Sequence, residues 1–287
     1  MTKTAAPMTS GSIWKQMTFF AMPIFLGNLF QQLYNTVDSL IVGNFLGSSA
    51  LAAVSSSGSL IFMLIGFLSG ISAGAGVIVA RFFGAGDEKN LQRAVHTTVA
   101  FGLVAGVLMT GVGVALSPQI LRWMDTPESV MRESVTYLQI YFAGSLGFVM
   151  YNVLVGILQA VGDSRHPLYY LIVSSVINLV LDLLFITGFH TGVGGAAVAT
   201  VISQIVSALL CFWQLLRTKE SYGLKIRKIR FDKGILVQII KIGLPSGVQN
   251  SIIAFANVIV QSNINAFGEM AMAENGLFLF SSMLNVL

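Results

Sequence analysis

Two acidic side chains stand inside long apolar stretches of the sequence. Asp38 lies in a run that begins at Met17, and Asp182 lies in a run that begins at Leu168. The other ten of the 12 acids fall in or beside the polar connections, and no lysine or arginine stands well within a run. An ionisable side chain at membrane depth costs about 2.5–3.5 kcal/mol on insertion scales, so it is kept where it faces a cavity or a partner. The two acids are therefore candidate functional residues.

Other polar side chains recur at helical spacing around these acids, and each set shares one face of its predicted helix. The sets are Asn28, Gln31, Tyr34, Asn35 and Asp38; Asn152 and Gln159; Asn178 and Asp182; and Thr200, Ser203, Gln204 and Ser207. Carboxylate, amide and hydroxyl oxygens suit a hard cation, and two neighbouring carboxyls favour uptake of a proton. The alternative is that the amides and hydroxyls join helices to one another.

Other kinds of site have little support. The single cysteine, Cys211, excludes an internal disulfide, and the three histidines lie far apart near the ends of apolar runs, which disfavours zinc. No serine–histidine or cysteine–histidine pattern indicates an enzyme, and no cofactor is expected. Tyr34 and Tyr137, with some of the phenylalanines, could line a pocket for aromatic organic cations through stacking and cation–π contacts.

Composition gives the elements that must position these residues. The chain has 287 residues, of which 55% are hydrophobic and 10% are charged, whereas a soluble domain is about 25% charged. Soluble, disordered, collagenous and coiled-coil classes are excluded, and an all-α polytopic membrane protein is predicted. Seven spans are expected, and an eighth run, Asn275–Leu287, is too short to span, so we expect the chain to end inside its eighth helix. The spans are Met17–Leu46, Leu51–Phe83, Ala94–Leu116, Met131–Ala160, Leu168–Phe189, Gly192–Leu216 and Ile235–Phe267.

The distribution of basic residues predicts the orientation. One side carries 14 of the 16 lysines and arginines, including the loop Arg217–Lys241, and the other carries Arg122 and Arg132. The positive-inside rule makes the N-terminus and that loop cytoplasmic. This also accounts for the net charge of +4 without a nucleic-acid partner. The run Lys225–Arg230 could touch anionic headgroups, but a topology-setting linker is the favoured interpretation.

A weak internal repeat predicts two lobes. Pro23, Asn28 and Asn35 align at one offset with Pro245, Asn250 and Asn257. Six spans separate the copies, so both point the same way, as in transporters whose halves are parallel repeats. We expect a cytoplasmic segment at 1–16, a six-helix N-lobe at 17–216, a basic linker at 217–234 and the beginning of a C-lobe at 235–287. The glycines at positions 66, 70 and 74 are predicted to pack helices together.

Several motifs give the chain a family resemblance. They are QAVGDSRHP at 159–167, GVGGAAVAT at 192–200, RFFGAGD at 81–87, and Pro23, Gln31, Tyr34 and Asp38 in the first span. Together they resemble the multidrug and toxic compound extrusion (MATE) family of secondary transporters. The resemblance implies twelve spans in two six-helix lobes, and exchange of Na⁺ or H⁺ for organic, often cationic, compounds.

The resemblance also implies roles for individual residues. Asp38, Asn178, Asp182 and Thr200 match the cation-coupling site, with oxygen atoms that could bind Na⁺. Gln31, Tyr34, Tyr137 and Asn152 match positions that line the cavity of the first lobe, and Asn35 joins them from its place on the same stripe. The seventh span carries Asn257 and Gln261 where some members have an acid. That departure favours coupling through the first lobe.

The leading hypothesis is a cation-coupled multidrug antiporter in the bacterial inner membrane, acting on small organic compounds. Carboxylates with oxygen neighbours serve sodium and protons alike, so both ions stay open. A flippase for lipid-linked sugars is the second hypothesis, and its anionic substrate would require intramembrane arginine or lysine. The third is a non-transporting fragment, which the early end of the chain would explain.

Overall fold

The computed structural model describes residues 12–124 and 126–265, and within these ranges the chain is helical without a strand. Short connections join long helices, as expected for a chain in lipid that must satisfy its backbone hydrogen bonds internally. The helices are α1 (Ile13–Leu46), α2 (Ser48–Gly84), α3 (Glu88–Trp123), α4 (Glu128–Ala143), α5 (Ser145–Ala160), α6 (Arg165–Leu183), α7 (Gly192–Arg217) and α8 (Lys233–Asn265). A π-helical turn, Leu184–Gly188, follows α6, and a 3-10 turn, Ile226–Lys228, precedes α8.

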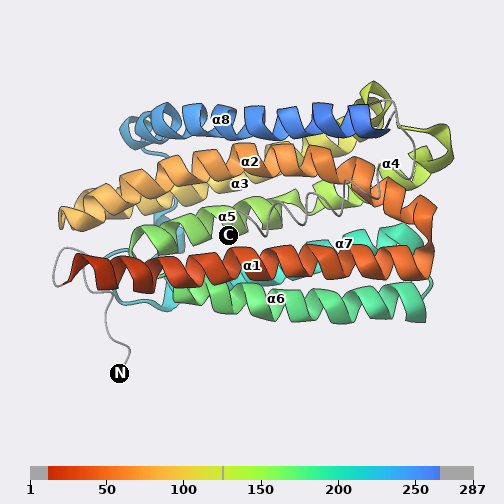
Figure 1. The fold of residues 1–287 in the computed structure, drawn as a ribbon. Helices are drawn as coiled ribbons and strands as arrows, with labels where there is room; N and C mark the ends of the chain where they lie inside the picture. The colour runs from red at the N-terminus through yellow and green to blue at the C-terminus, as the bar shows by residue number, and fades with distance from the viewer. Residues whose placement is uncertain (1–11, 125, 266–287) are drawn as a thin grey trace.

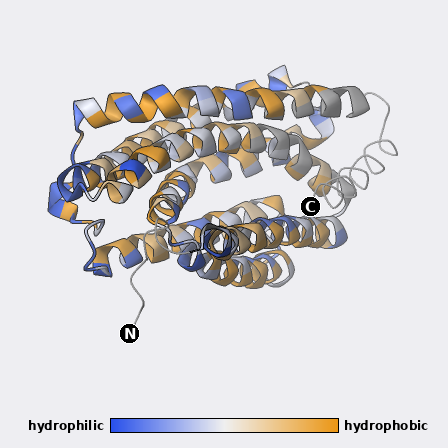
Figure 2. Ribbon diagram, turned by 60° about the vertical axis from the view of Figure 1, so that its left-hand side comes forward, coloured by the Kyte–Doolittle hydropathy of each residue, from blue (hydrophilic) through white to orange (hydrophobic). Residues whose placement is uncertain are grey.

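The helices lie lengthwise in one elongated bundle (Figure 1). α8 packs along α2, while α1 packs against α6, and α7 contacts α4, α5 and α6. Hydrophilic residues gather at the end of the bundle where α7 is connected to α8 (Figure 2). The apolar lengths and polar end match a protein that crosses a bilayer.

Four of the described helices are long and apolar enough to cross a membrane, or five if the bent pair α4–α5 is one span. Many large hydrophobic side chains on them are exposed, for example Val107 and Leu108 on α3, which suits contact with lipid. The chain is therefore a multi-pass membrane protein. The count of seven spans stays a prediction, and the eighth run at 275–287 lies outside the described residues.

Three predicted spans differ in detail from the structure. The expected fourth span is broken at Gly144 into α4 and α5, which meet at 50°. A Cβ atom at Gly144 would overlap the side chain of Val201 on α7, so the bend lies where α7 comes closest. The third helix continues beyond Leu116 to Trp123, with Pro118 inside it. The fifth leaves α-helical geometry after Leu183.

The glycine stripe on α2 forms a packing seam with α8, which confirms that prediction. A Cβ atom at Gly70 would overlap the backbone of Gly247, and one at Gly74 would overlap Gly243. At Gly66 the seam widens, and a Cβ there would lie 3.5 Å from Cβ of Asn250. Small residues at facing positions thus let two helix backbones approach closely.

Two of the sequence motifs turn out to be helix corners. Gly86 and Gly162 both have positive φ, at 68° and 88°, a conformation that glycine adopts without strain. The aspartate that follows each glycine then caps the next helix. Asp87 Oδ1 accepts from Asn90 N (3.1 Å), and Asp163 Oδ1 accepts from His166 N (3.2 Å). These corners explain the Gly-Asp pairs of RFFGAGD and QAVGDSRHP as structural devices.

Candidate functional site

Packing of α1 against α6 brings together the two acids that stand in apolar runs of the sequence. The carboxyl groups of Asp38 on α1 and Asp182 on α6 lie close enough together to interact. Asp182 is fully buried, whereas Asp38 is half-buried. Two carboxylates this close repel each other unless one is protonated or a cation lies between them. Two acids far apart in the sequence therefore form one site.

Asn178 connects this pair to α7. It lies one helical turn before Asp182 and is buried. With its amide oriented to suit its neighbours, Nδ2 donates to Asp182 Oδ2 (2.7 Å) and Oδ1 accepts from the backbone N–H of Thr200 (3.2 Å). The amide thus fixes the Asp182 carboxyl relative to both α6 and α7.

Hydroxyl groups complete the cluster. Tyr34 on α1 lies near Thr200 on α7, whose Oγ1 donates to Ala196 O (3.0 Å). Tyr137 on α4 is buried near both acids. Tyr141, which the sequence interpretation missed, stacks beside it with ring centroids 6.4 Å apart. Its spacing of four residues from Tyr137 was the available signal.

One oxygen of each acid lacks a protein partner. Asp38 Oδ1 and Asp182 Oδ1 are both buried and have no hydrogen-bond partner in the described part of the chain. A buried acceptor that stays unpaired costs about 1–3 kcal/mol, more when it is charged. Both oxygens can therefore accept a ligand, and oxygen donors of this kind suit Na⁺ or a proton.

A π-helical turn follows the site directly. Leu184–Gly188 begins two residues after Asp182, and Thr187 Oγ1 donates to Leu183 O within it. Such turns insert one residue into a helix and occur frequently at functional sites. No sequence pattern indicated this turn, because its residues are as apolar as the rest of the run.

The structure brings together some of the predicted site residues and not others. The residues that lie together, called the acid cluster from here on, are Tyr34, Asp38, Asn178, Asp182 and Thr200, with Tyr137 beside them.

In the described part of the chain, no hydrogen bond joins the other three predicted cavity residues to the acid cluster. Within the described residues, Asn152 Nδ2 donates to Phe148 O of its own helix (2.9 Å), Gln31 is half-buried and Asn35 is exposed. A role for these three in lining a substrate cavity stays a prediction.

Acids near the helix ends are held differently. Asp232 pairs with Arg93, and Asp163 Oδ2 lies 2.6 Å from His166 Nδ1. A backbone hydrogen bond from Ile235, assisted by Arg93, lowers the pKa of Asp232, and bonds from Asn90 lower the pKa of Asp87. These acids thus already have partners, whereas the pair Asp38 and Asp182 has none of basic character among the described residues.

Comparison with known proteins gives a consistent answer. The MatE family model matches residues 23–184. The probable multidrug resistance protein YoeA of Bacillus subtilis strain 168 is 34% identical over 273 residues, covering 93% of this chain and 59% of YoeA. The multidrug export protein MepA of Staphylococcus saprophyticus is 25% identical over 267 residues, with the same two shares. The chain thus spans 59% of the length of these curated relatives.

Solved structures resemble the fold over its length. A MOP superfamily transporter from Pyrococcus furiosus, described as having a binding pocket of reverse polarity that suggests a different function, matches with TM-score 0.88 and 27% identity. The match covers 100% of this chain and 63% of the Pyrococcus furiosus chain. A MATE family transporter in its outward-facing conformation matches with TM-score 0.85 and 26% identity, covering 100% of this chain and 62% of that one.

Proposed function

The chain belongs to the MatE family, and from this premise we propose that it forms the first lobe of an efflux transporter that exchanges a cation for organic compounds. Family members are transport proteins rather than enzymes, and relatives carry the names multidrug resistance and multidrug export protein. The observation that carries the proposal is the acid pair, Asp38 and Asp182, with one buried, unpaired oxygen on each carboxyl.

The geometry supports a simple coupling step. A cation or a proton that binds between Asp38 and Asp182 reduces the negative charge of the pair. It also gives a partner to the two unpaired carboxyl oxygens. Because these acids stand on α1 and α6, and Asn178 links them to α7, occupancy changes how tightly these helices hold together. A ligand that prefers one packing shifts the population toward it. Release of the cation on the other side then restores the first packing.

The proposed architecture has two lobes. Residues 17–216 form the N-lobe, 217–234 the linker and 235–287 the beginning of the C-lobe, within a plan of twelve spans. The N-terminus is cytoplasmic, and the membrane is the bacterial inner membrane. Solved relatives occur in inward-facing and outward-facing conformations, which supports alternating access by rocking of lobes.

The flippase alternative would require basic residues deep in the spans. The sequence places every lysine and arginine of this chain at or near a predicted span end, and the structure brings Asp38 and Asp182 to the site instead. An acidic site favours a cationic ligand over a pyrophosphate. The polarity of the site therefore supports antiport.

The experiment uses the full-length protein in proteoliposomes loaded with a fluorescent organic cation. A sodium gradient and a proton gradient are imposed separately on wild type, Asp38→Asn and Asp182→Asn. We expect efflux under one gradient and a loss of at least about 100-fold in each variant, because an unpaired carboxylate is worth several kcal/mol to a bound cation. Asp232→Asn, which removes an acid paired with Arg93, is the matched control and retains efflux. Unchanged efflux in both site variants would refute the coupling role.

A further inference from the structure

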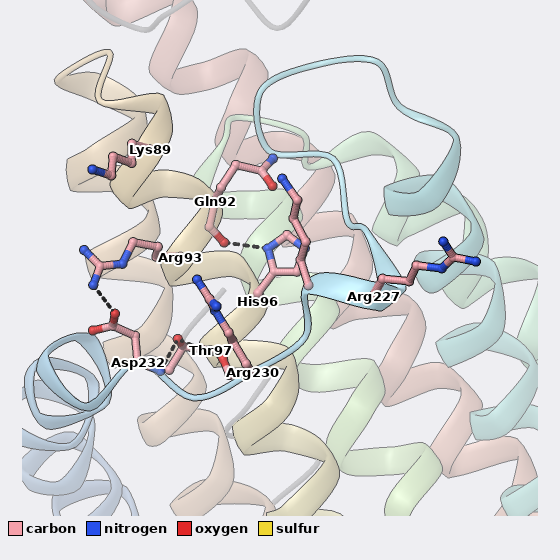
Figure 3. Close-up of a pocket in the computed structure, with 9 residues that line it drawn as sticks. Lys89, Gln92, Arg93, His96, Thr97, Arg227, Arg230 and Asp232 are labelled. Carbon is pink, nitrogen blue, oxygen red and sulfur yellow. Dashed lines mark hydrogen bonds and ion pairs between the residues drawn. The ribbon is translucent and has the colours of Figure 1, made fainter.

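A second polar region lies at the end of the bundle, outside the acid cluster. It is a pocket of about 610 Å³ between the first turns of α3 and the linker that leads into α8 (Figure 3). We call it the basic pocket, and its lining residues are Lys89, Gln92, Arg93, His96, Thr97, Arg227, Lys228, Arg230 and Asp232.

The linker wall of this pocket is fixed to α3 by hydrogen bonds. Gln92 Nε2 donates to the carbonyl oxygens of Ser221 and Gly223. His96, which is buried, accepts from the backbone N–H of Lys225 at Nε2 (3.0 Å). These contacts hold the beginning of the linker in one path.

Thr97 fixes the far end of the same segment. Its Oγ1 accepts from Asp232 N (3.1 Å) and lies 3.4 Å from Arg230 O. The backbone between Lys225 and Asp232 is therefore anchored at both ends, so the basic side chains on it start from defined positions. A preorganised wall costs less to order when a ligand binds.

The charge of the pocket is strongly one-sided. Five basic side chains, Lys89, Arg93, Arg227, Lys228 and Arg230, surround a single acid, Asp232. That acid is paired with Arg93, and the other four basic residues make no ion pair in the described part of the chain. Arginine guanidinium groups bind phosphate oxygens in bidentate geometry, and lysine binds them as a point charge. The pocket is therefore suited to a phosphate group.

Apolar residues on the linker indicate the source of that phosphate. Ile226 and Phe231, which flank the basic residues in sequence, are 60% and 47% exposed. The apolar stretches of α3 and α7 also end here, at the polar end of the bundle seen in Figure 2. Exposed apolar side chains among basic residues are typical of segments that lie at a bilayer surface.

We propose that the basic pocket binds the phosphate headgroup of an anionic phospholipid, with Ile226 and Phe231 against its acyl region. The bound lipid holds the linker at the membrane surface, where the proposed lobes are joined. This inference does not depend on the coupling ion or on the acid cluster.

The test measures lipid binding by the full-length protein in detergent, by native mass spectrometry. Dioleoyl-phosphatidylglycerol is titrated against wild type and against the triple variant Arg227→Gln, Lys228→Gln, Arg230→Gln. We expect the dissociation constant to rise about 100-fold, since each basic residue near an anionic lipid contributes roughly fivefold. The matched control is Lys219→Gln, Lys225→Gln, Lys241→Gln, which removes the same charge from positions that do not line the pocket.

A further variant and two further ligands distinguish the possible outcomes. The variant Arg227→Lys, Arg230→Lys retains charge and should keep binding within a few fold, which excludes misfolding as the cause of loss. Dioleoyl-phosphatidylcholine should bind wild type and both triple variants equally weakly. Equal losses in the pocket and control triples would overturn the proposal. Displacement of the lipid by inorganic phosphate at similar concentration would overturn its lipid source.

Discussion

The acid cluster and the basic pocket are both polar, yet they satisfy their charges in opposite ways. In the basic pocket Asp232 has a resident partner in Arg93, and the excess charge is positive and faces an opening. In the acid cluster Asp38 and Asp182 face each other and leave one oxygen each unpaired. An acid that has a fixed basic partner serves structure, because the charge is already balanced. An acid pair without one needs a mobile cation, which is what a coupling site must bind and release.

The largest effect is expected when the acid cluster is given a permanent positive charge. Asn178→Lys places an ammonium group beside Asp182, where the native amide donates to Oδ2. A fixed cation competes with the mobile one, so gradient-driven efflux should fall by at least about 100-fold, equivalent to more than 2.7 kcal/mol. The measurement is initial efflux from proteoliposomes holding the full-length protein.

Asn178→Ala is the control for that change. It removes the amide without adding charge, and should lower efflux by only about tenfold, as expected for one hydrogen bond to a charged group. If the alanine variant were as inactive as the lysine variant, the lost amide rather than the added charge would be responsible. The proposed contrast between the two regions would then lose its electrostatic basis.

The next change tests how much the close contact between α2 and α8, away from both polar regions, contributes to stability. Gly70→Ala puts a Cβ atom into the backbone of Gly247, which has little room to move. We expect about 1–3 kcal/mol of destabilisation from overpacking. Thermal unfolding of the full-length protein checks this. Gly111→Ala on α3, where a Cβ meets nothing within 4 Å, is the matched control and should be neutral or stabilising.

A smaller effect is expected from the hydroxyls of the acid cluster. Tyr34→Phe removes the hydroxyl that lies near Thr200 and leaves the ring in place. Loss of this polar group from the site, at about 1 kcal/mol, should weaken the apparent affinity for the coupling cation about fivefold. Efflux is measured as a function of sodium or proton concentration. Thr200→Ser retains a hydroxyl and should behave as wild type, whereas equal weakening in both variants would argue for a general packing effect.

The smallest effect concerns the paired acid at the helix end. A backbone hydrogen bond from Ile235 and the Arg93 guanidinium lower the pKa of Asp232. Its stabilising contribution is therefore complete above the unfolded pKa of about 3.9 and is lost as the pH falls through the folded value. Asp232→Asn should lower the melting temperature by roughly 2 °C at pH 7, with the difference shrinking below about pH 4. A difference that grew on acidification would contradict this sign.

Much of the helical framework could be predicted from the residues alone. The apolar runs predicted seven helical stretches with approximate bounds. The spacing of Asn178 and Asp182 predicted that both lie on one face of their helix. The glycine spacing on α2 correctly indicated a close helix contact. Periodicity defines these features because each depends on a single helix and its own faces.

The remaining features depend on contacts between helices. The break at Gly144 lies where Val201 of α7 approaches, and the π-turn after Asp182 has no distinguishing residues. The sequence predicted only a charged linker, whereas hydrogen bonds with Gln92, His96 and Thr97 fix the linker backbone to α3. Sequence patterns could not reveal these features, since the partner residues are distant in the chain.

From the sequence alone it followed that this protein lies in a membrane and that two acids stand within long apolar runs. The packing of the helices was needed to show that Asp38 and Asp182 lie close together, and that five basic side chains surround one pocket. Hydrophobicity and helical period are local properties of the chain, so they can be read from the order of its residues. Which faces meet is set by the shapes of several packed helices together, and that information appears only when the chain is folded.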